Sequence, residues 1–289
     1  MMLKNFPLSR WLFSLLVLGA VSCQTSRDPA PSAPSTAVLP EHLTLGNPSG
    51  ATSDASQPTN YLLLKPQFAL SYHRDQGKPN WVSWHLSGDW LGSAARQDDF
   101  RPDAELPAGW YQVSASSYSG SGFDRGHNCP SADRTRTVAD NSATFLMTNM
   151  MPQAPRNNQQ TWANLEDYCR TLVGQGNELY IICGSYGRGG TGSNGYLTTL
   201  DQGRVTVPAR CWKVVVVLPV GTDDAARVTS ATRVIAIDTP NDNSLSTSWG
   251  QYRTSVDAIE AATGLDVLSV VAPAVQQTVE ARTDNGPTS

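Results

Sequence analysis

The sequence is poor in charge, and especially in lysine and histidine. Only 16% of its 289 residues are charged, and the formal net charge is −4. Four of the 21 basic residues are lysines, and the chain has four histidines. An acidic chain has no general attraction to polyanions. This composition excludes binding through a broad basic surface, so an anionic ligand must be held locally by a few arginines or by a metal ion.

Cysteine is also scarce. The chain has five cysteines and no Cys-x-x-Cys pair, which argues against a zinc knuckle. In an oxidising compartment, the even number that remains besides Cys23 indicates one or two disulfides. The sequence leaves the three pairings of four cysteines open. These residues are Cys129, Cys169, Cys183 and Cys211.

The apolar run over residues 11–22 is too short for a membrane-spanning helix, which needs roughly 20 residues. It follows the basic residues Lys4 and Arg10 and precedes small residues. A basic start, a short apolar stretch and a small-residue exit are typical of a secretory signal. We therefore predict a signal peptide over residues 1–23 and an exported protein.

The end of this signal, Ala20-Val21-Ser22-Cys23, is similar to the cleavage box of bacterial lipoproteins. In that box the cysteine becomes the lipidated first residue, although Ala20 stands where leucine is usual. Lipidation of Cys23 and free secretion both stay open on a motif this short. The expected location is the periplasm, the cell surface by way of a lipidated Cys23, or the medium.

Large apolar residues are rare in residues 24–59, where Ser, Thr, Pro and Ala dominate. Such a segment buries too little surface to offset its ordering entropy, which predicts a disordered tether. From Asn60 onward, large apolar residues and tryptophans become regular. Residues 60–282 are long enough for one sizeable domain with a core, and a short tail follows over residues 283–289.

Aromatic and β-branched residues predict strands over residues 61–72, 81–86, 179–183, 211–218 and 228–237. Apolar spacing predicts helices over residues 158–173, 255–263 and 271–281. Because the strands and helices do not alternate, the expected class is α+β with a mostly antiparallel central sheet flanked by helices. The glycine-rich residues 184–195 lack Gly-Lys-Ser/Thr and a following helix, so they indicate a surface hairpin and not a phosphate loop.

The stretch FDRGHNCPSADR, residues 123–134, concentrates charge in a chain that otherwise has little. It places Asp124, Arg125 and His127 within four positions, whereas a simple turn needs no titratable base between charged residues. A histidine titrates near neutrality and can act as a general base. The other three histidines are interpreted as structural, because His42 lies in the predicted tether and His73 and His85 have no charged or metal-type companions at suggestive spacing.

A second polar group follows on the predicted helix and contains Asn158, Glu166 and Arg170. At roughly 100° per residue, Glu166 and Arg170 are neighbours one turn apart. The apolar residues of this helix point into the core. One interpretation is catalytic; the alternative is an i,i+4 ion pair on an exposed helix, with Asn158 as a helix-start residue.

Together these blocks resemble the DNA/RNA non-specific endonucleases, whose active site is a ββα-metal motif. The resemblance rests on Asp124-Arg125-Gly126-His127, residues 130–134 (PSADR), residues 145–153 (FLMTNMMPQ), and Asn158 with Trp162 and Glu166. It extends to residues 81–86, 180–184, 207–216 and 258–266. It therefore covers nearly all of residues 60–275 and implies that residues 60–282 are a nuclease domain.

The resemblance implies a role for three of these residues around one phosphate. His127 would be the base that deprotonates water in line with the scissile bond. Asn158 would be the sole direct protein ligand of a Mg²⁺ ion, which prefers oxygen and keeps several waters; Mn²⁺ or another divalent ion is the alternative. Glu166 would hold a metal-bound water.

The remaining site residues are charged side chains around this centre. By resemblance, Arg96 stabilises the transition state, Arg170 is a second arginine of the site, and Asp124 orients its neighbours. Arg125 would contact phosphate, with a structural pairing to Asp124 or another carboxylate as the alternative. Cys129 could be a second nucleophile, although a disulfide partner is the expected role in an exported protein.

The expected function is an exported Mg²⁺-dependent endonuclease that hydrolyses phosphodiester bonds of DNA and RNA and leaves 5′-phosphate ends. Two alternatives are a tethered surface lipoprotein that binds nucleic acid without cutting it, and a phosphodiesterase for small substrates. A binder has no use for a base and a metal seat together, so the complete set of site residues argues against the first alternative.

Overall fold

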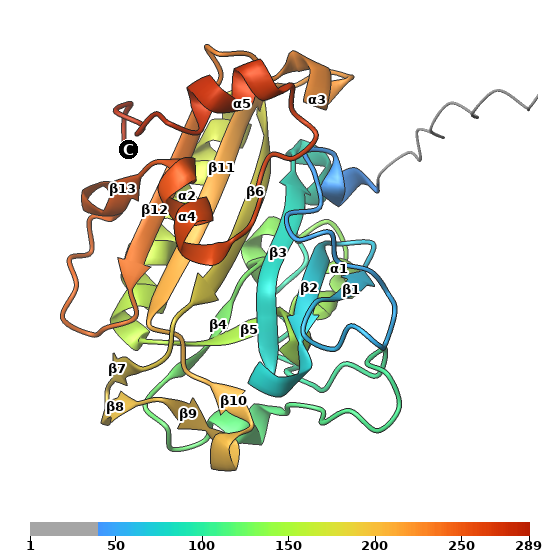
Figure 1. Ribbon diagram of the computed structural model, residues 1–289, viewed down its shortest axis with the longest axis vertical. Coiled ribbons are helices and arrows are strands. Elements are labelled where there is room, and N and C mark those ends of the chain that lie inside the picture. The colour runs from blue at the N-terminus through green and yellow to red at the C-terminus, as the bar shows by residue number, and fades with distance from the viewer. Residues whose placement is uncertain (1–39) are drawn as a thin grey trace, which may run out of the picture. The chain divides into compact units, whose positions relative to one another are not determined.

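Seven antiparallel strands form the central sheet of the protein (Figure 1). The computed structural model describes residues 40–289, so the predicted signal peptide, Cys23 and the start of the predicted tether lie outside the described residues. In spatial order the strands are β1 (Tyr61–Leu64), β2 (Ala69–His73), β3 (Lys78–Leu86), β6 (Asn177–Tyr186), β11 (Arg210–Pro219), β12 (Arg233–Pro240) and β13 (Arg253–Thr254). The antiparallel α+β class is confirmed. Within the described part of the chain, no helix is long and apolar enough to cross a membrane.

The central strands are buried on both faces because their side chains alternate between two cores. On β11, Val214 and Val216 pack in one core, whereas Cys211 and Val215 pack in the other. Lys213 alternates with these residues and is also fully buried. The strand therefore carries a charged group into an apolar layer, and the partner of that charge is part of the site described below.

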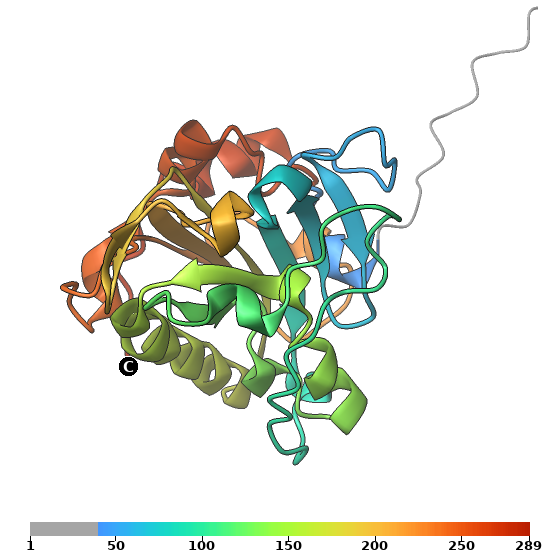
Figure 2. The ribbon, with the colours of Figure 1, turned by 90° about the horizontal axis from the view of Figure 1, so that it is seen from below.

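One face of the sheet is covered by a two-stranded antiparallel sheet and a helix (Figure 2). The strands are β4 (Asp124–His127) and β5 (Met150–Gln153), and the helix is α2 (Ala163–Gly174). Helix α2 follows a π-helical segment, η7 (Asn157–Trp162). Trp162, Leu165 and Cys169 pack against the sheet, as their helical spacing predicts. Strand, strand and helix thus occur in ββα order on this face.

The opposite face is covered by the C-terminal helices α4 (Val256–Thr263) and α5 (Pro273–Val279), and by residues 40–59. The prediction of a disordered tether is wrong for these residues. Leu43, Leu45 and Ala51 are buried in the core of this face. Ser49 Oγ accepts a hydrogen bond from Trp81 Nε1 at 2.8 Å. A few apolar side chains and hydrogen bonds to the sheet therefore order a segment whose composition is mostly polar.

Several predicted boundaries shift in the structure. The strand predicted over residues 61–72 is two strands joined by a turn at Lys65–Phe68, and the last long strand begins at Arg233 after a short helix α3 (Asp224–Arg227). Helix α4 ends at Thr263, and the next residue, Gly264, has a φ of +72° that suits glycine. The glycine-rich segment forms the predicted hairpin, β7 (Gly190–Gly192) and β8 (Gly195–Leu197).

The remaining elements are α1 (Val138–Ala143), β9 (Thr199–Leu200), β10 (Val205–Thr206), and the 3₁₀ helices η1 (Glu41–Leu43), η2 (Arg74–Gln76), η3 (Gly88–Trp90), η4 (Ala115–Tyr118), η5 (Ser131–Asp133), η6 (Met147–Asn149), η8 (Asp201–Gly203) and η9 (Trp249–Tyr252).

The disulfide prediction is also wrong for the part of the chain that the structure describes. All four cysteines there are free thiols, and they are at most 1% exposed. They lie in the core between the sheet and α2, where a thiol packs as a small apolar group. Burial raises the pKa of Cys129, Cys169 and Cys211 to about 12. These thiols are inert, so Cys129 offers no second nucleophile.

Candidate active site

The β4–β5 pair and the helix that follows it bring most of the predicted site residues to one cavity. This cavity has a volume of about 220 Å³. It is lined by Arg96, Arg125, His127, Pro130, Ser131, Ala132, Asn158, Ala163 and Glu166. His127 lies opposite Met150 in the strand pair, and Asp124 lies opposite Gln153. Residues far apart in the sequence thus meet because β4 and β5 pair antiparallel and β5 leads directly into η7.

Gly126 allows β4 and β5 to approach each other closely. A Cβ atom at this residue would lie 2.6 Å from Gln153 Cβ and 3.1 Å from the backbone oxygen of Met151. Any side chain would therefore push β5 away from β4. Since β4 carries His127 and β5 leads to Asn158, glycine here sets the distance between the two sides of the cavity.

His127 lies among aromatic rings and positive charges that keep it neutral. Its ring makes edge contacts with Phe100 and Phe145, at centroid distances of 5.6 and 4.9 Å. Burial, followed by the guanidinium groups of Arg96 and Arg125, lowers the pKa of His127 to about 3. The imidazole is therefore unprotonated at neutral pH and able to accept a proton. Its Nε2 atom is buried without a hydrogen-bond partner.

Asn158 is held in place by Asp124. The side-chain nitrogens of Asn158 and Gln159 both donate to Asp124 Oδ2, each at 2.8 Å. Because its nitrogen is occupied, Asn158 has its amide oxygen left to bind a cation. Glu166 adds a carboxylate to the same cavity. An amide oxygen and a carboxylate suit a hard divalent cation, so these residues fit the expected metal ion.

Glu166 has a buried partner that sequence reasoning missed. The Nζ of Lys213 lies 2.8 Å from Glu166 Oε1 and 4.2 Å from the centre of the Trp162 ring. The Lys213 side chain is 1% exposed. Burial raises the pKa of Glu166, and the ammonium group opposes that rise. The available signal was a lone lysine in CWKVVVVL, a strand otherwise apolar enough to be central.

The two arginines of the cavity lie over aromatic faces. The guanidinium of Arg125 is 4.1 Å from the centre of the Phe100 ring, and that of Arg96 is 4.8 Å from the centre of Phe145. Arg96 also donates to Asp98 and Ser131. Arg125 makes no ion pair with any described residue, so the alternative of a structural pairing with Asp124 is not realised. Its donors remain available to an anion in the cavity.

Arg170 does not reach this cavity. It donates to Asp133 at 2.7 Å and also pairs with Asp167. The alternative of an i,i+4 pair with Glu166 is not realised among the described ion pairs, since Lys213 takes that carboxylate. Asp133 also accepts from Trp84 Nε1 at 3.0 Å. The structure therefore places Arg170 in a partly buried ion pair with Asp133 and not among the residues that line the cavity.

The last charged residue of the motif, Arg134, is likewise structural. Its side chain is fully buried and donates to the backbone oxygens of Gln67, Asp133 and His85. It also lies 4.2 Å from the centre of the Trp90 ring. The first part of FDRGHNCPSADR thus faces the cavity, whereas its last two residues join the segment to the sheet.

A wider groove continues from the cavity and shares its wall residues Arg96, Arg125 and Asn158. The groove has a volume of about 350 Å³. Its other lining residues are Asp98, Phe100, Ala115, Tyr118, Ser119, Phe123, Asp124 and Gln159. A ligand bound at His127 therefore has room to extend along the surface on the side of η4.

Comparisons with known proteins agree with this site. The family model described as DNA/RNA non-specific endonuclease matches residues 46–274. A protein named Nuclease from Nostoc sp. (strain PCC 7120 / SAG 25.82 / UTEX 2576) is 52% identical over 273 residues, which cover 93% of this chain and 96% of the relative. Nuclease C1 of Cunninghamella echinulata var. echinulata is 32% identical over 211 residues, covering 70% and 81%.

The fold is also similar to a solved structure. A chain in the crystal structure of the EndoG/EndoGI complex, a study of EndoG inhibition, superposes with a TM-score of 0.65. The two chains are 21% identical, and the match covers 82% of this chain and 95% of that one. This likeness supports the fold, and the sequence matches carry the family assignment. The chain belongs to the DNA/RNA non-specific endonuclease family and is a phosphodiester hydrolase that acts on nucleic acid.

Proposed function

We propose that this nuclease is an exported, Mg²⁺-dependent endonuclease that cuts DNA and RNA without base specificity and leaves 5′-phosphate ends. The observation that carries the proposal is one cavity in which a neutral imidazole, His127, lies together with the amide of Asn158 and the carboxylate of Glu166. Arg96 and Arg125 line the same space. This set supplies a base, oxygen ligands for a cation, and donors for phosphate oxygens.

Each side chain has one task in the hydrolysis. Arg125 and Arg96 bind the non-bridging oxygens of the scissile phosphate and place the phosphorus atom beside His127. The unprotonated imidazole accepts a proton from the attacking water. The water oxygen bonds to phosphorus while the bond to the 3′ oxygen breaks, so the upstream fragment leaves with a 3′-hydroxyl and the phosphate stays on the 5′ oxygen of the downstream fragment. Held by Asn158 and, through water, by Glu166, a bound Mg²⁺ ion would stabilise the negative charge that develops on the leaving oxygen.

The lack of base specificity follows from which atoms the cavity contacts. Its arginines bind phosphate oxygens, and phosphate contacts position a nucleic acid without distinguishing its base sequence. The adjoining groove of about 350 Å³ extends from the same residues. A polymer uses this additional surface, whereas a small phosphodiester does not, so the groove favours a polynucleotide substrate. The net charge of −4 implies modest, salt-sensitive affinity.

Export rests on the signal pattern of residues 1–23. The free thiols of the domain are compatible with an oxidising compartment, because they are buried beyond the reach of an oxidant. Lipidation of Cys23 would anchor the domain to a membrane. Cell fractionation of the natural protein and a Cys23→Ser variant tests both ideas: movement of the variant from membrane to soluble fraction supports lipidation, and cytoplasmic retention of the natural protein refutes export.

The decisive test of function is digestion of supercoiled plasmid and of RNA across a series of Mg²⁺, Mn²⁺ and chelator concentrations. We expect both polymers to be cut and activity to be lost in EDTA. We also expect the 5′ ends of the products to be labelled by a kinase only after phosphatase treatment, since 5′-phosphate blocks that labelling. A protein that retains the polymers on a filter but leaves them intact would be a binder. Cleavage of a dinucleotide without cleavage of plasmid would indicate a small-substrate phosphodiesterase.

A further inference from the structure

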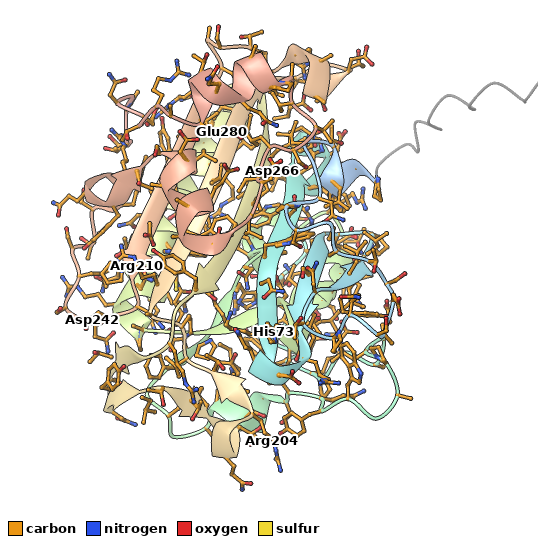
Figure 3. All side chains as sticks on the ribbon, viewed as in Figure 1. His73, Arg204, Arg210, Asp242, Asp266 and Glu280 are labelled. Carbon is orange, nitrogen blue, oxygen red and sulfur yellow. The ribbon has the colours of Figure 1, made fainter. Side chains whose placement is uncertain are left out.

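Three carboxylates meet on the face of the sheet opposite the active site. Asp257 and Glu260 belong to α4, and Glu280 immediately follows α5. Their ligand oxygens all lie within 4.8 Å of one another. Figure 3 labels Glu280 and, lower in the same view, Asp266. The negative charge of Asp266 also contributes to raising the pKa of Glu280. The backbone N–H of Asp257 donates to the carbonyl of Glu280 at 3.1 Å, so the two helices are already joined here.

Glu280 is the unusual member of this acidic group. It is only 6% exposed, and its Oε1 atom is buried without a hydrogen-bond partner. Burial and the negative charges of Glu260, Asp266 and Asp257 together raise the pKa of Glu280 to about 7. None of the ion pairs formed by the described residues involves these carboxylates. A buried carboxylate with an unpaired oxygen and only negative neighbours lacks a compensating cation.

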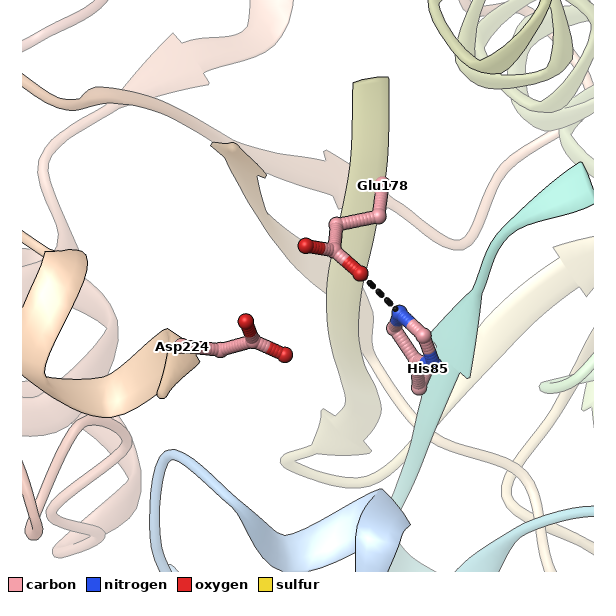
Figure 4. A group of neighbouring side chains, drawn as sticks. All are labelled: His85, Glu178 and Asp224. Carbon is pink, nitrogen blue, oxygen red and sulfur yellow. Dashed lines mark hydrogen bonds and ion pairs between the residues drawn. The ribbon is translucent and has the colours of Figure 1, made fainter. Parts of the chain in front are cut away.

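A second group of metal-type residues shows the opposite arrangement (Figure 4). There His85 contacts Glu178 at 3.0 Å, and Asp224 lies nearby. Arg227 pairs with Glu178 and with Asp224, and the backbone N–H of Gly221 donates to Glu178 at 2.9 Å. The protein's own cations and donors satisfy these carboxylates. This second group needs no metal ion. The acidic group on α4 and α5 has no cationic partner among the described residues, and its one backbone donor, the N–H of Val267, reaches Glu260 and not Glu280.

We propose that Asp257, Glu260 and Glu280 form a structural Ca²⁺ site that fastens α4 to the end of α5. Calcium takes six to eight oxygen ligands at about 2.3–2.6 Å, from carboxylates, carbonyls and water. Two oxygens on one such ion can be at most about 5 Å apart, and the three carboxylates meet that limit as they stand. Asp257 is exposed, so the site is open to ions and water on that side.

The site is separate from the catalytic centre. Helices α4 and α5 pack on one core, and α2 packs on the other, so the sheet lies between the two sites. Calcium at the new site would raise stability without entering the reaction. Binding to the folded state alone raises the melting temperature in a saturable way.

The test uses the full chain with Asn158→Ala, so that the proposed catalytic ligand is absent. We expect CaCl₂ to raise the melting temperature of this protein by about 5 °C at saturation. Titration calorimetry with CaCl₂ should show one equivalent bound. Glu280→Gln in the same background should melt higher than its parent without calcium, because repulsion is removed, and should no longer respond to calcium. Glu105→Gln, the same change at an exposed residue on the other side of the sheet, is the matched control and should keep the response.

Three results would overturn the proposal. One is the absence of a calcium-dependent rise in the Asn158→Ala protein. Another is a rise of equal size in the Glu280→Gln variant, which would mean that the ion binds elsewhere. The third is an equal response to MgCl₂ at the same concentrations, which would refute the assignment to calcium.

Discussion

His127 is the proposed proton acceptor, and burial with two nearby arginines keeps its imidazole unprotonated before the reaction. Replacing it by alanine removes the base but leaves the surrounding Phe100 and Phe145 in place. We expect His127→Ala to lower the turnover of plasmid DNA by about 10²–10⁴-fold, the usual contribution of a general base. Nicking assays at saturating Mg²⁺ measure the loss, and a melting curve shows that the fold is retained. Activity within threefold of the natural enzyme would remove the base assignment.

The lowered pKa of His127 also predicts how the cleavage rate depends on pH. A histidine of ordinary pKa, near 6.5, would lose roughly 25-fold of its unprotonated form between pH 7 and pH 5. With a pKa of about 3, the imidazole stays unprotonated throughout this range. We therefore expect the single-turnover rate at saturating Mg²⁺ to fall by less than about fivefold between these pH values. A steep decline with a midpoint near 6.5 would show that the imidazole titrates normally when substrate is bound.

Asp124 acts on the metal through Asn158, since it accepts the hydrogen bond that fixes the amide. We expect Asn158→Ala to abolish most activity at low Mg²⁺. Asp124→Asn should raise the Mg²⁺ concentration for half-maximal activity by about tenfold, the usual effect of losing an orienting partner. Gln159→Ala is the matched control, because Gln159 donates to the same carboxylate but is exposed. Equal Mg²⁺ titrations for the natural protein and Asp124→Asn would contradict this role.

At the scale of secondary structure, the ββα order of the site was predictable and its supporting contacts were not. The helical spacing of Trp162, Leu165 and Cys169 predicted α2 from a local pattern, whereas the two strands of the motif were expected only from the family resemblance. The ion pair of Lys213 with Glu166 depends on β11 packing against α2, and no local pattern reports such a contact. For the same reason the resemblance placed Arg170 at the site, whereas in the structure it pairs with Asp133 and does not line the cavity.

The Lys213–Glu166 pair joins the central sheet to the helix that carries the site. Lys213→Met leaves Glu166 largely buried without its cation, so we expect a loss of about 3 kcal/mol in the free energy of unfolding. Glu166→Gln added to Lys213→Met should recover most of this loss, since a neutral amide tolerates burial better. Urea titrations of the natural protein, both single variants and the double variant give the coupling energy. Additive single effects would show that the two groups do not interact.

At the scale of the whole molecule, composition predicted a domain that begins at Asn60, whereas the folded chain begins earlier. Residues 40–59 contain few large side chains, yet Leu43 and Leu45 cover the sheet and Ser83 Oγ donates to the carbonyl of His42 at 2.6 Å. Composition averages over a segment and misses two well-placed leucines. It also misses hydrogen bonds that only the folded sheet provides. The antiparallel class, by contrast, follows from the order of elements, which the sequence shows directly.

The four described cysteines bear on how the whole domain is stabilised. Export predicted disulfides, but the described thiols are separate, buried groups of one core. Stability therefore comes from packing on both faces of the sheet and not from covalent links. We expect dithiothreitol to leave the melting temperature of a Cys23→Ser protein unchanged within 1–2 °C, because it has no disulfide to reduce. In that protein, a thiol reagent should label no cysteine in the folded state and four after denaturation. Fewer than four reactive thiols in the denatured, unreduced protein would show that a disulfide forms in the mature enzyme.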